Sequence, residues 1–287
     1  MSNPKVSIMI TTRNRLSDLK RTCDVLTRLN PPPHEVLVTA DGCTDGTVEY
    51  LKANHPDFRL TINQQGRGSV ASRAAMMQQA TGDLVLALDD DSYPEQLNCL
   101  DTLAQIFAKH PKLAIATFPQ RTDEYPETLT QKDFGPSKPV RSFANSGACL
   151  RVSTYRSLPG FEPMFFHMYE EPDYAIQCIA NDWQVYYFPE ITIRHHYSPI
   201  RRNEVRNHHL HARNEFWSVI MRCPNPYCIP LALYRILSQA RYALSRGPQW
   251  LIQEPKWWWQ ALIAFPQALK RRQALSWNGY RAWLKHP

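Results

Sequence analysis

Short β-rich runs alternate regularly with helix-period stretches over the first 118 residues, and this alternation constrains the fold more than any other feature of the sequence. The β-rich runs are dense in Val, Ile, Leu and Thr, and the stretches between them repeat apolar residues every three or four positions. The predicted strands cover residues 6–11, 35–40, 58–63, 84–89 and 114–118, and the predicted helices cover residues 16–29, 47–54, 69–80 and 94–110.

This order of elements predicts an α/β fold with a mostly parallel, doubly wound sheet covered by helices. In such sheets ligands bind beyond the carboxyl ends of the strands. Thr11, Asp41 and Asp89 stand at three of these ends. They are therefore the first candidates for a binding site.

The chain changes character after residue 118. Residues 120–141 carry charges and turn residues without a clear period, which predicts a long loop of the kind that often covers a site. A strand is expected at residues 146–152, and a strand pair at 183–188 and 191–195 that turns at Pro189-Glu190. Helical periods broken by prolines follow, so we expect an α/β domain over residues 1–200 and a helical region over residues 201–287.

The run Asp89-Asp90-Asp91 follows a buried strand directly. Three adjacent carboxylates repel one another, and their burial is costly unless a cation compensates. Oxygen ligands of this kind suit Mg²⁺ or Mn²⁺, which keep open positions for phosphates. In strand geometry Asp89 and Asp91 project to one side and Asp90 to the other. A solvated turn that caps the following helix is the alternative.

A second acidic cluster, Glu170-Glu171-Pro172-Asp173, opens a helical pattern beside an aromatic run. Helix starts often carry proline and acids, which accounts for one or two of these carboxylates. A carboxylate among like charges and apolar neighbours has a raised pKa, so a general base at Glu170 or Glu171 is a second interpretation. His195 closes a strand and is either a packed histidine or a further metal ligand.

Three segments together resemble the inverting family 2 glycosyltransferases with the GT-A fold. They are Val6-Ser-Ile-Met-Ile-Thr-Thr-Arg-Asn-Arg15, Glu35-Val-Leu-Val-Thr-Ala-Asp-Gly-Cys-Thr-Asp-Gly-Thr47 and Gly82-Asp-Leu-Val-Leu-Ala-Leu-Asp-Asp-Asp91. The order continues through Glu170-Glu171-Pro-Asp173, which is similar to the acidic catalytic motif of that family, and through His195. The resemblance covers roughly residues 5–200.

The resemblance implies transfer from a nucleoside-diphosphate sugar with Mn²⁺ or Mg²⁺. Residues 1–119 would bind the donor and residues 120–200 would complete the acceptor and catalytic part. The donor-binding residues that it implies are Thr11, Arg13, Asp41, Arg73, Asp89 and Asp90. Asp89, Asp91 and His195 would hold the metal, and Glu171, or else Glu170, would be the base.

The sequence departs from the family pattern at three positions. Ala40 stands where many members have an aspartate, Cys43 replaces a serine, and Glu171 replaces a frequent aspartate. The first departure leaves both uridine and thymidine donors open. The third leaves the choice between Glu170 and Glu171 open.

The charge of +7 is distributed unevenly. Residues 194–287 contain 15 Lys and Arg against three acids, and seven of the eight tryptophans. Basic amphipathic helices rich in tryptophan are typical of attachment to an anionic membrane surface, which we expect for residues 215–287. Packing of these tryptophans in a core is the alternative, and nucleic acid is not the expected partner because no nucleic-acid motif accompanies the charge.

Other classes are excluded by what the sequence lacks. No apolar run approaches the 20 residues of a spanning helix, no secretory leader opens the chain, and the seven cysteines contain no CxxC pair. We therefore expect a cytoplasmic enzyme on the inner face of the plasma membrane, with a lipid-linked glycan, lipopolysaccharide or exopolysaccharide precursor as acceptor. A nucleotidyltransferase that makes an activated sugar and a noncatalytic lipid- or nucleic-acid-binding protein remain alternatives.

Overall fold

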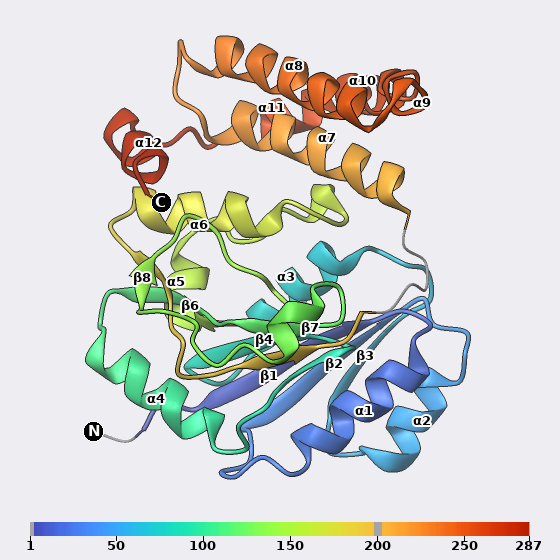
Figure 1. Cartoon of the computed structure of the whole chain (residues 1–287), viewed down its shortest axis with the longest axis vertical. Helices are drawn as coiled ribbons and strands as arrows, with labels where there is room; N and C mark the ends of the chain where they lie inside the picture. Colours follow the sequence, from blue (N-terminus) through green and yellow to red (C-terminus); the bar gives the residue numbers. More distant parts are fainter. Residues whose placement is uncertain (1–2, 198–202, 287) are drawn as a thin grey trace.

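One eight-stranded sheet organises the protein, as seen in a computed structural model that describes residues 3–197 and 203–286 (Figure 1). Its strands are β1 (Val6–Thr12), β2 (Glu35–Asp41), β3 (Arg59–Asn63), β4 (Leu84–Asp89), β6 (Leu113–Thr117), β8 (Lys138–Pro139), β9 (Ala148–Arg151) and β10 (Gln184–Tyr187). They are arranged in the order β3-β2-β1-β4-β9-β6-β10-β8. Only β9 and β8 run against the common direction, which confirms the predicted, mostly parallel α/β fold.

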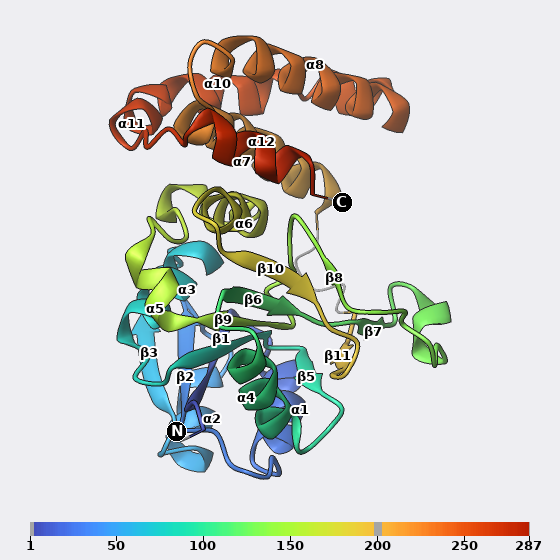
Figure 2. The ribbon, with the colours of Figure 1, turned by 90° about the vertical axis from the view of Figure 1, so that its left-hand side faces the viewer.

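Helices cover both faces of the sheet. Ile8 and Ile10 of β1 pack toward one face, and Met9 between them packs toward the other, so the strand is apolar at nearly every position. The first face carries α1 (Leu16–Leu26), α2 (Thr47–Asn54) and α4 (Cys99–Lys109). The second face carries α3 (Ser69–Gln79), α5 (Val152–Ser157) and α6 (Glu170–Ala180) (Figure 2).

A smaller sheet corrects two of the sequence predictions. It has the order β5-β11-β7, formed by β5 (Ser92–Pro94), β11 (Ile193–His195) and β7 (Gln120–Thr122). Because residues 92–94 form β5, the helix expected from residue 94 begins at Cys99. The segments 183–188 and 191–195 do not pair with each other: β10 runs parallel to β6, and β11 runs parallel to β7. Each segment therefore pairs with an earlier part of the chain, β6 or β7, and the prediction that the two form a hairpin was wrong.

The long loop expected at residues 120–141 is largely irregular and exposed. It contains only β7, a 3₁₀ turn at Pro126–Leu129 and the two-residue strand β8.

The register of the two sheets determines which residues lie beside the acidic run. Thr11 lies beside Asp89 in the main sheet, and His195 lies opposite Ser92 in the small sheet. The carboxyl ends of β1, β4 and β11 therefore meet.

A helical layer follows the α/β part, as expected from the sequence. It consists of α7 (Glu204–Arg222), α8 (Cys228–Arg246), α9 (Pro248–Leu251), α10 (Pro255–Ile263), α11 (Phe265–Lys270) and α12 (Trp277–Leu284). Helices α7 and α12 contact α6, and α8 and α10 pack on α7, farther from the sheet (Figures 1 and 2). The expected boundary between residues 200 and 201 lies outside the described residues.

The tryptophans of this layer divide into two groups. Trp217, Trp257 and Trp283 are buried, and Trp217 and Trp283 belong to the same apolar core as the sheet. Trp258, Trp259 and Trp277 are exposed. Packing in a core is therefore correct for three of these tryptophans, and attachment of the exposed ones to a membrane stays a prediction. Within residues 3–197 and 203–286, no helix has the length and apolar character needed to cross a bilayer.

A buried ion pair joins the two parts of the molecule. Asp173 of α6 is fully buried and accepts hydrogen bonds from Ser218 Oγ at 2.7 Å and from Arg222 Nε and Nη2 at 3.1 Å, both residues of α7. The third acid of the Glu170–Asp173 cluster thus stabilises the interface between α6 and α7. It does not face the candidate site.

We expect Asp173→Ala to lower the free energy of unfolding by about 3–5 kcal/mol, because it leaves the buried guanidinium of Arg222 without a counter-charge. Urea denaturation followed by circular dichroism measures this change. Glu190→Ala is the matched control, since it removes an exposed carboxylate and should alter the stability by less than about 0.5 kcal/mol. Equal stabilities of the two variants would contradict the role of the pair.

Candidate active site

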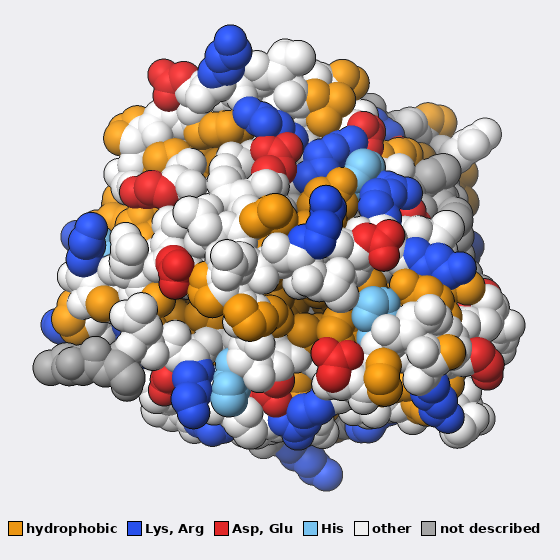
Figure 3. All heavy atoms as spheres, turned by 90° about the horizontal axis from the view of Figure 1, so that it is seen from below, with side chains coloured by type: hydrophobic (Ala, Val, Ile, Leu, Met, Phe, Trp, Pro, Cys, Tyr) orange, Lys and Arg blue, Asp and Glu red, His pale blue; other side chains and the backbone are white. Residues whose placement is uncertain are grey.

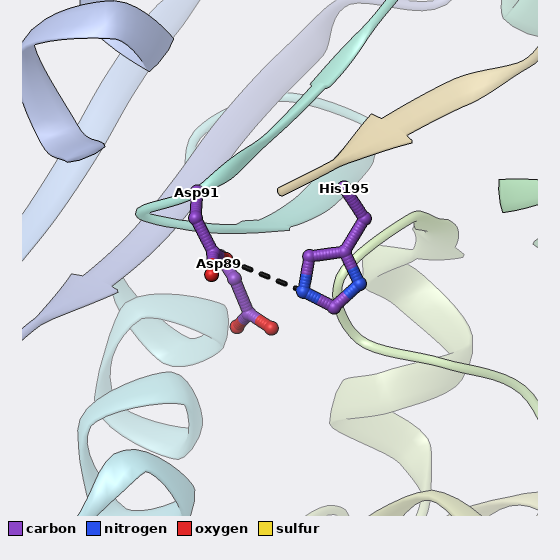
Figure 4. A group of neighbouring side chains, drawn as sticks. All are labelled: Asp89, Asp91 and His195. Atoms are coloured by element: carbon purple, nitrogen blue, oxygen red, sulfur yellow. Dashed lines mark ion pairs between the residues drawn. The ribbon is translucent and has the colours of Figure 1, made fainter. Parts of the chain in front are cut away.

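The acidic run forms a tight turn between β4 and β5. The backbone N–H of Asp89 donates to Ser92 Oγ at 2.8 Å, and Thr22 Oγ1 donates to the carbonyl oxygen of Asp90 at 2.9 Å. These bonds direct the side chains of Asp89 and Asp91 toward the same space, which His195 of β11 enters from the small sheet (Figure 4). One ligand atom from each of the three residues lies within 4.8 Å of the others.

A chain of hydrogen bonds fixes the ring of His195. Its Nδ1 lies 3.0 Å from Gln120 Oε1, and Gln120 Nε2 donates to Ser146 Oγ at 2.7 Å. Because an amide oxygen only accepts, Nδ1 donates the hydrogen bond to Gln120. Nε2 lies 3.3 Å from Asp91 Oδ1, where it pairs with the carboxylate when protonated and offers a lone pair to a metal when it is not. An imidazole held in this way by a second residue is typical of histidines that bind metals.

The three residues fit a divalent cation. Asp91 Oδ1 is buried and accepts no hydrogen bond from the described residues. Such an orphaned carboxylate oxygen is costly unless a cation is nearby. Two carboxylates and one imidazole nitrogen are ligands suited to Mn²⁺ or Mg²⁺. The structure therefore brings together the metal-ligating residues expected from the sequence.

Two arginines also balance the acidic run. Arg15 pairs with Asp90 Oδ1 at 2.7 Å and with Asp91, and Arg73 pairs with Asp89. Burial raises the pKa of Asp90 to about 8, although Arg15 opposes the shift. Burial would also raise the pKa of Asp91, but His195 and Arg15 hold it below its usual value. Arg15 thus lies between Asp90 and Asp91, and the candidate metal ligands are Asp89, Asp91 and His195 without Asp90. Residues 90 and 91 lie in a turn, so the alternation expected for a strand does not apply to them.

The two glutamates at the start of α6 have different environments. Glu170 is buried, and it accepts hydrogen bonds from Arg73 Nη1 at 2.9 Å and from Asn145 Nδ2 at 3.4 Å. Glu171 is only half-buried and has no cation in contact among the described residues. Burial and the charge of Glu170 raise the pKa of Glu171 to about 8, against the effect of Arg73. Glu170 therefore forms an ion pair with Arg73, whereas Glu171 forms none among the described residues and accepts only a long hydrogen bond of 3.5 Å from the backbone N–H of Asn145.

The turn before α6 is strained and firmly held. Phe166, Met168 and Tyr169 all have positive φ, which is costly for residues with side chains. The amide of the fully buried Asn214 in α7 contacts the carbonyl oxygens of Phe165, His167 and Met168 at 2.8–3.0 Å. Asn214 thus fixes the segment from which Glu170 and Glu171 emerge.

The expected donor-binding residues surround one cavity of about 640 Å³. Thr11 and Arg13 line it beside Asp41, whose carboxylate already accepts bonds from Asn63 Nδ2 at 2.7 Å and from the backbone N–H groups of Arg67 and Gly68 at 2.8 and 2.9 Å. Asp41 thereby orders the loop that precedes α3. The other residues around the cavity include Arg73, Asp89, Asp90, Asp91, Glu170, Glu171 and His195.

Sequence reasoning missed several residues of this cavity. Arg15 could have been suspected, because it follows Arg13 in the loop after the first strand. Asn145 and His167 carried no motif. Arg206 and Asn207 line the cavity from the first turns of α7, in the region expected to be separate from the α/β domain.

Solved structures with the same fold confirm the architecture. TarS 1-349 of S. aureus superposes with a TM-score of 0.63 at 18% identity, over 92% of this chain and 81% of that chain. The mannosyltransferase PcManGT from Pyrobaculum calidifontis, in complex with GDP-Man and Mn²⁺, gives a TM-score of 0.58 at 17% identity over 99% of this chain and 87% of that chain. GalNAc-T7 with UDP, GalNAc and Mn²⁺ gives 0.62 at 12% identity over 78% and 49%.

Characterised and uncharacterised glycosyltransferases match part of the sequence. The glycosyltransferase YwdF of Bacillus subtilis is 30% identical over 91 residues, which cover 31% of this chain and 33% of YwdF. Poly-beta-1,6-N-acetyl-D-glucosamine synthase of Staphylococcus epidermidis is 26% identical over 115 residues, which cover 39% of this chain and 27% of the synthase. The matched segments thus span about a third or less of these relatives. The sequence profile of glycosyl transferase family 2, in contrast, matches residues 7–224, and the chain therefore belongs to that family.

Proposed function

We propose that this glycosyltransferase moves a sugar from a UDP- or dTDP-linked donor to an acceptor hydroxyl, with inversion at the anomeric carbon. The observation that carries the proposal is one cavity that holds the Asp89, Asp91 and His195 triad together with the unpaired carboxylate of Glu171. Complexes of neighbouring structures with UDP, UDP-GlcNAc or GDP-Man support a nucleotide-sugar donor. Family membership favours sugar transfer over nucleotidyl transfer and over a purely binding role.

The acidic end of the cavity binds the donor diphosphate in this proposal. Asp89, Asp91 and His195 would hold a divalent cation, which would supply the positive charge that a diphosphate and a departing nucleotide require. Thr11, Arg13 and Asp41 border the nucleoside, and Arg73 borders the ribose or the phosphates. Gln120 orients the ring of His195 so that Nε2 faces Asp91.

Glu171 is the base in this proposal. The acceptor oxygen attacks the anomeric carbon while its proton passes to a carboxylate oxygen of Glu171. The bond from that carbon to the diphosphate breaks on the opposite face, so a single displacement inverts the centre. Glu170 is less suited to this role, because its carboxylate is buried against Arg73. We therefore assign Glu170 to holding Arg73 in position.

The outer layer of helices is proposed to rest on an anionic membrane. The exposed side of α8 carries Ile229, Leu233 and Leu237 at intervals of four residues, and α10 exposes Trp259 and Leu262. These helices lie farthest from the sheet (Figures 1 and 2). Exposed apolar side chains flanked by arginines are typical of helices that lie in a membrane interface.

The face of the molecule opposite the helical layer has a different distribution of charged side chains. In Figure 3, acidic and basic side chains are intermixed over the face that lies away from the helical layer. The seven cysteines are all unpaired, as expected for a reducing compartment. We accordingly propose the inner face of the plasma membrane as the place of action, with a glycan or glycolipid precursor as acceptor.

We expect UDP with Mn²⁺ to raise the melting temperature of the wild type, and EDTA to remove the effect. Ligand at 100 times its Kd adds about 2.7 kcal/mol of stability. Asp91→Ala and His195→Ala should both lose this stabilisation, because each removes a ligand atom. Asp101→Ala, an exposed acid on α4, should keep it. Full stabilisation of both site variants would show that the metal site is wrongly assigned.

We expect Glu171→Gln to lower kcat by about 10²–10⁴-fold and to leave the stabilisation by UDP with Mn²⁺ unchanged, because the amide cannot accept the proton. Glu171→Asp should retain part of the activity. The wild-type kcat should increase as the pH rises through about 8, since the pKa of Glu171 is raised and the base acts in its deprotonated form. Steady-state kinetics measure both effects, and normal turnover by Glu171→Gln would refute the assignment.

We expect Leu237→Asn and Trp259→Asn each to weaken binding to vesicles of phosphatidylcholine and phosphatidylglycerol by about tenfold, the equivalent of losing part of one buried apolar side chain. Both side chains are more than half exposed, at 60% and 64%. Leu97→Asn removes an exposed leucine outside this layer and is the control. Wild-type binding by both variants, or concentration-dependent dimers without vesicle binding, would speak against the membrane contact.

A further inference from the structure

A second cavity, of about 480 Å³, opens beside the candidate active site between the first half of α7 and the start of α10. Arg206 lines both cavities, so the two adjoin at this side chain. Its wall contains basic residues and neutral amides but no carboxylate. The polar residues of the wall are Asn203, Arg206, His209, Arg213, Lys256, Gln253 and Gln260.

The cations of this cavity lack counter-charges among the described residues. Arg206 and Lys256 are exposed and Arg213 is half-buried, and none of the three forms an ion pair within residues 3–197 and 203–286. The two nearest acids in the sequence are engaged elsewhere. Glu204 pairs with Arg246 at 2.7 Å, and the fully buried Glu254 accepts hydrogen bonds from His208 Nε2 and Trp257 Nε1, each at 2.8 Å.

Further donors face the same space. Among the described residues, the buried His209 Nε2 has no hydrogen-bond partner and lies 3.7 Å from the Glu254 carboxylate. Arg213 donates to the carbonyl oxygen of Phe165 at 2.9 Å, to Asn214 Oδ1 and, at 3.4 Å, to Gln260 Oε1, so it contributes its charge more than free donors. The first turn of α7 adds the positive end of a 19-residue helix. An anion in the cavity would supply the counter-charge that Arg206, Arg213 and Lys256 lack.

We propose that this second cavity binds a phosphate or diphosphate group carried by the acceptor, an inference that rests on the proposed sugar transfer. A phosphate presents several oxygens in a tetrahedral arrangement, so cations from α7 and α10 can contact it from different sides. Because Arg206 and Asn207 also border the active site, an acceptor anchored here extends toward Glu171. The cavity thereby selects phosphorylated acceptors over neutral glycans.

The test measures binding of inorganic pyrophosphate to the full chain by isothermal titration calorimetry, with EDTA present so that the metal site takes no part. Lys256→Gln should weaken binding by about tenfold, since it removes one charge-assisted contact. Arg206→Gln should have a similar effect. Lys270→Gln is the matched control, because it removes an exposed lysine of the same helical region outside the cavity.

The outcomes separate this inference from the proposed function. Equal pyrophosphate affinity of the wild type, Lys256→Gln and Arg206→Gln, or no binding by the wild type, would overturn it. Asp91→Ala should bind pyrophosphate normally and lose binding of UDP with Mn²⁺, whereas Lys256→Gln should show the reverse. If UDP with Mn²⁺ fails to bind the wild type while the pyrophosphate result holds, the donor assignment fails and the anion site remains.

The source of the phosphate is distinguished with vesicles of phosphatidylcholine containing phosphatidic acid. A loss of vesicle binding in Lys256→Gln that exceeds the loss in Lys270→Gln assigns the phosphate to a lipid headgroup. Equal vesicle binding by the two variants, together with weaker pyrophosphate binding by Lys256→Gln, assigns it to a water-exposed part of the acceptor. Both results support the proposed anion site.

Discussion

The mutual repulsion of the carboxylates around the end of β4 is the constraint on which the rest of the site depends. Asp89, Asp90, Asp91, Glu170 and Glu171 all border one cavity, and among residues 3–197 and 203–286 two arginines pair with them. Burial, together with the neighbouring carboxylates, raises the pKa values of Asp90 and Glu171 to about 8. Asp91 Oδ1 accepts no hydrogen bond from the described residues. A divalent cation between Asp89, Asp91 and His195 would relieve the remaining repulsion.

The helical layer is part of the site and not an appendage to it. Asn214 holds the strained turn before α6, Arg222 neutralises Asp173, and Arg206 borders the cavity. All three residues come from α7, within the segment that matches the family profile. One helix thus contacts both the turn that carries Glu170 and Glu171 and the edge of the cavity. Contact of that layer with a membrane would therefore also influence the geometry of the site.

The sequence predicted features that lie within one continuous segment, but not contacts between residues far apart in the chain. The strands β1, β2 and β4 and the acidic run at the end of β4 are continuous segments with a clear period, and they were predicted correctly. The pairing of β10 with β6 and of β11 with β7 joins residues about 70 apart, which a hydrophobic pattern cannot specify. For the same reason the contacts of Arg15 with Asp91 and of Gln120 with His195 were not foreseen. The choice between Glu170 and Glu171 likewise needed the position of Arg73.

The uneven charge of the sequence corresponds to two adjoining cavities, one rich in carboxylates and one rich in cations. The acidic part meets the basic part at Arg206, where a cavity lined by carboxylates adjoins one lined by cations. A donor diphosphate needs a metal to approach the first cavity, whereas a phosphate can enter the second directly. Two anionic groups bound on opposite sides of the acceptor hydroxyl would fix its distance from the anomeric carbon, and such positioning lowers the barrier of a bimolecular step. In the proposed arrangement, the acidic cavity would hold the donor and the basic cavity the acceptor.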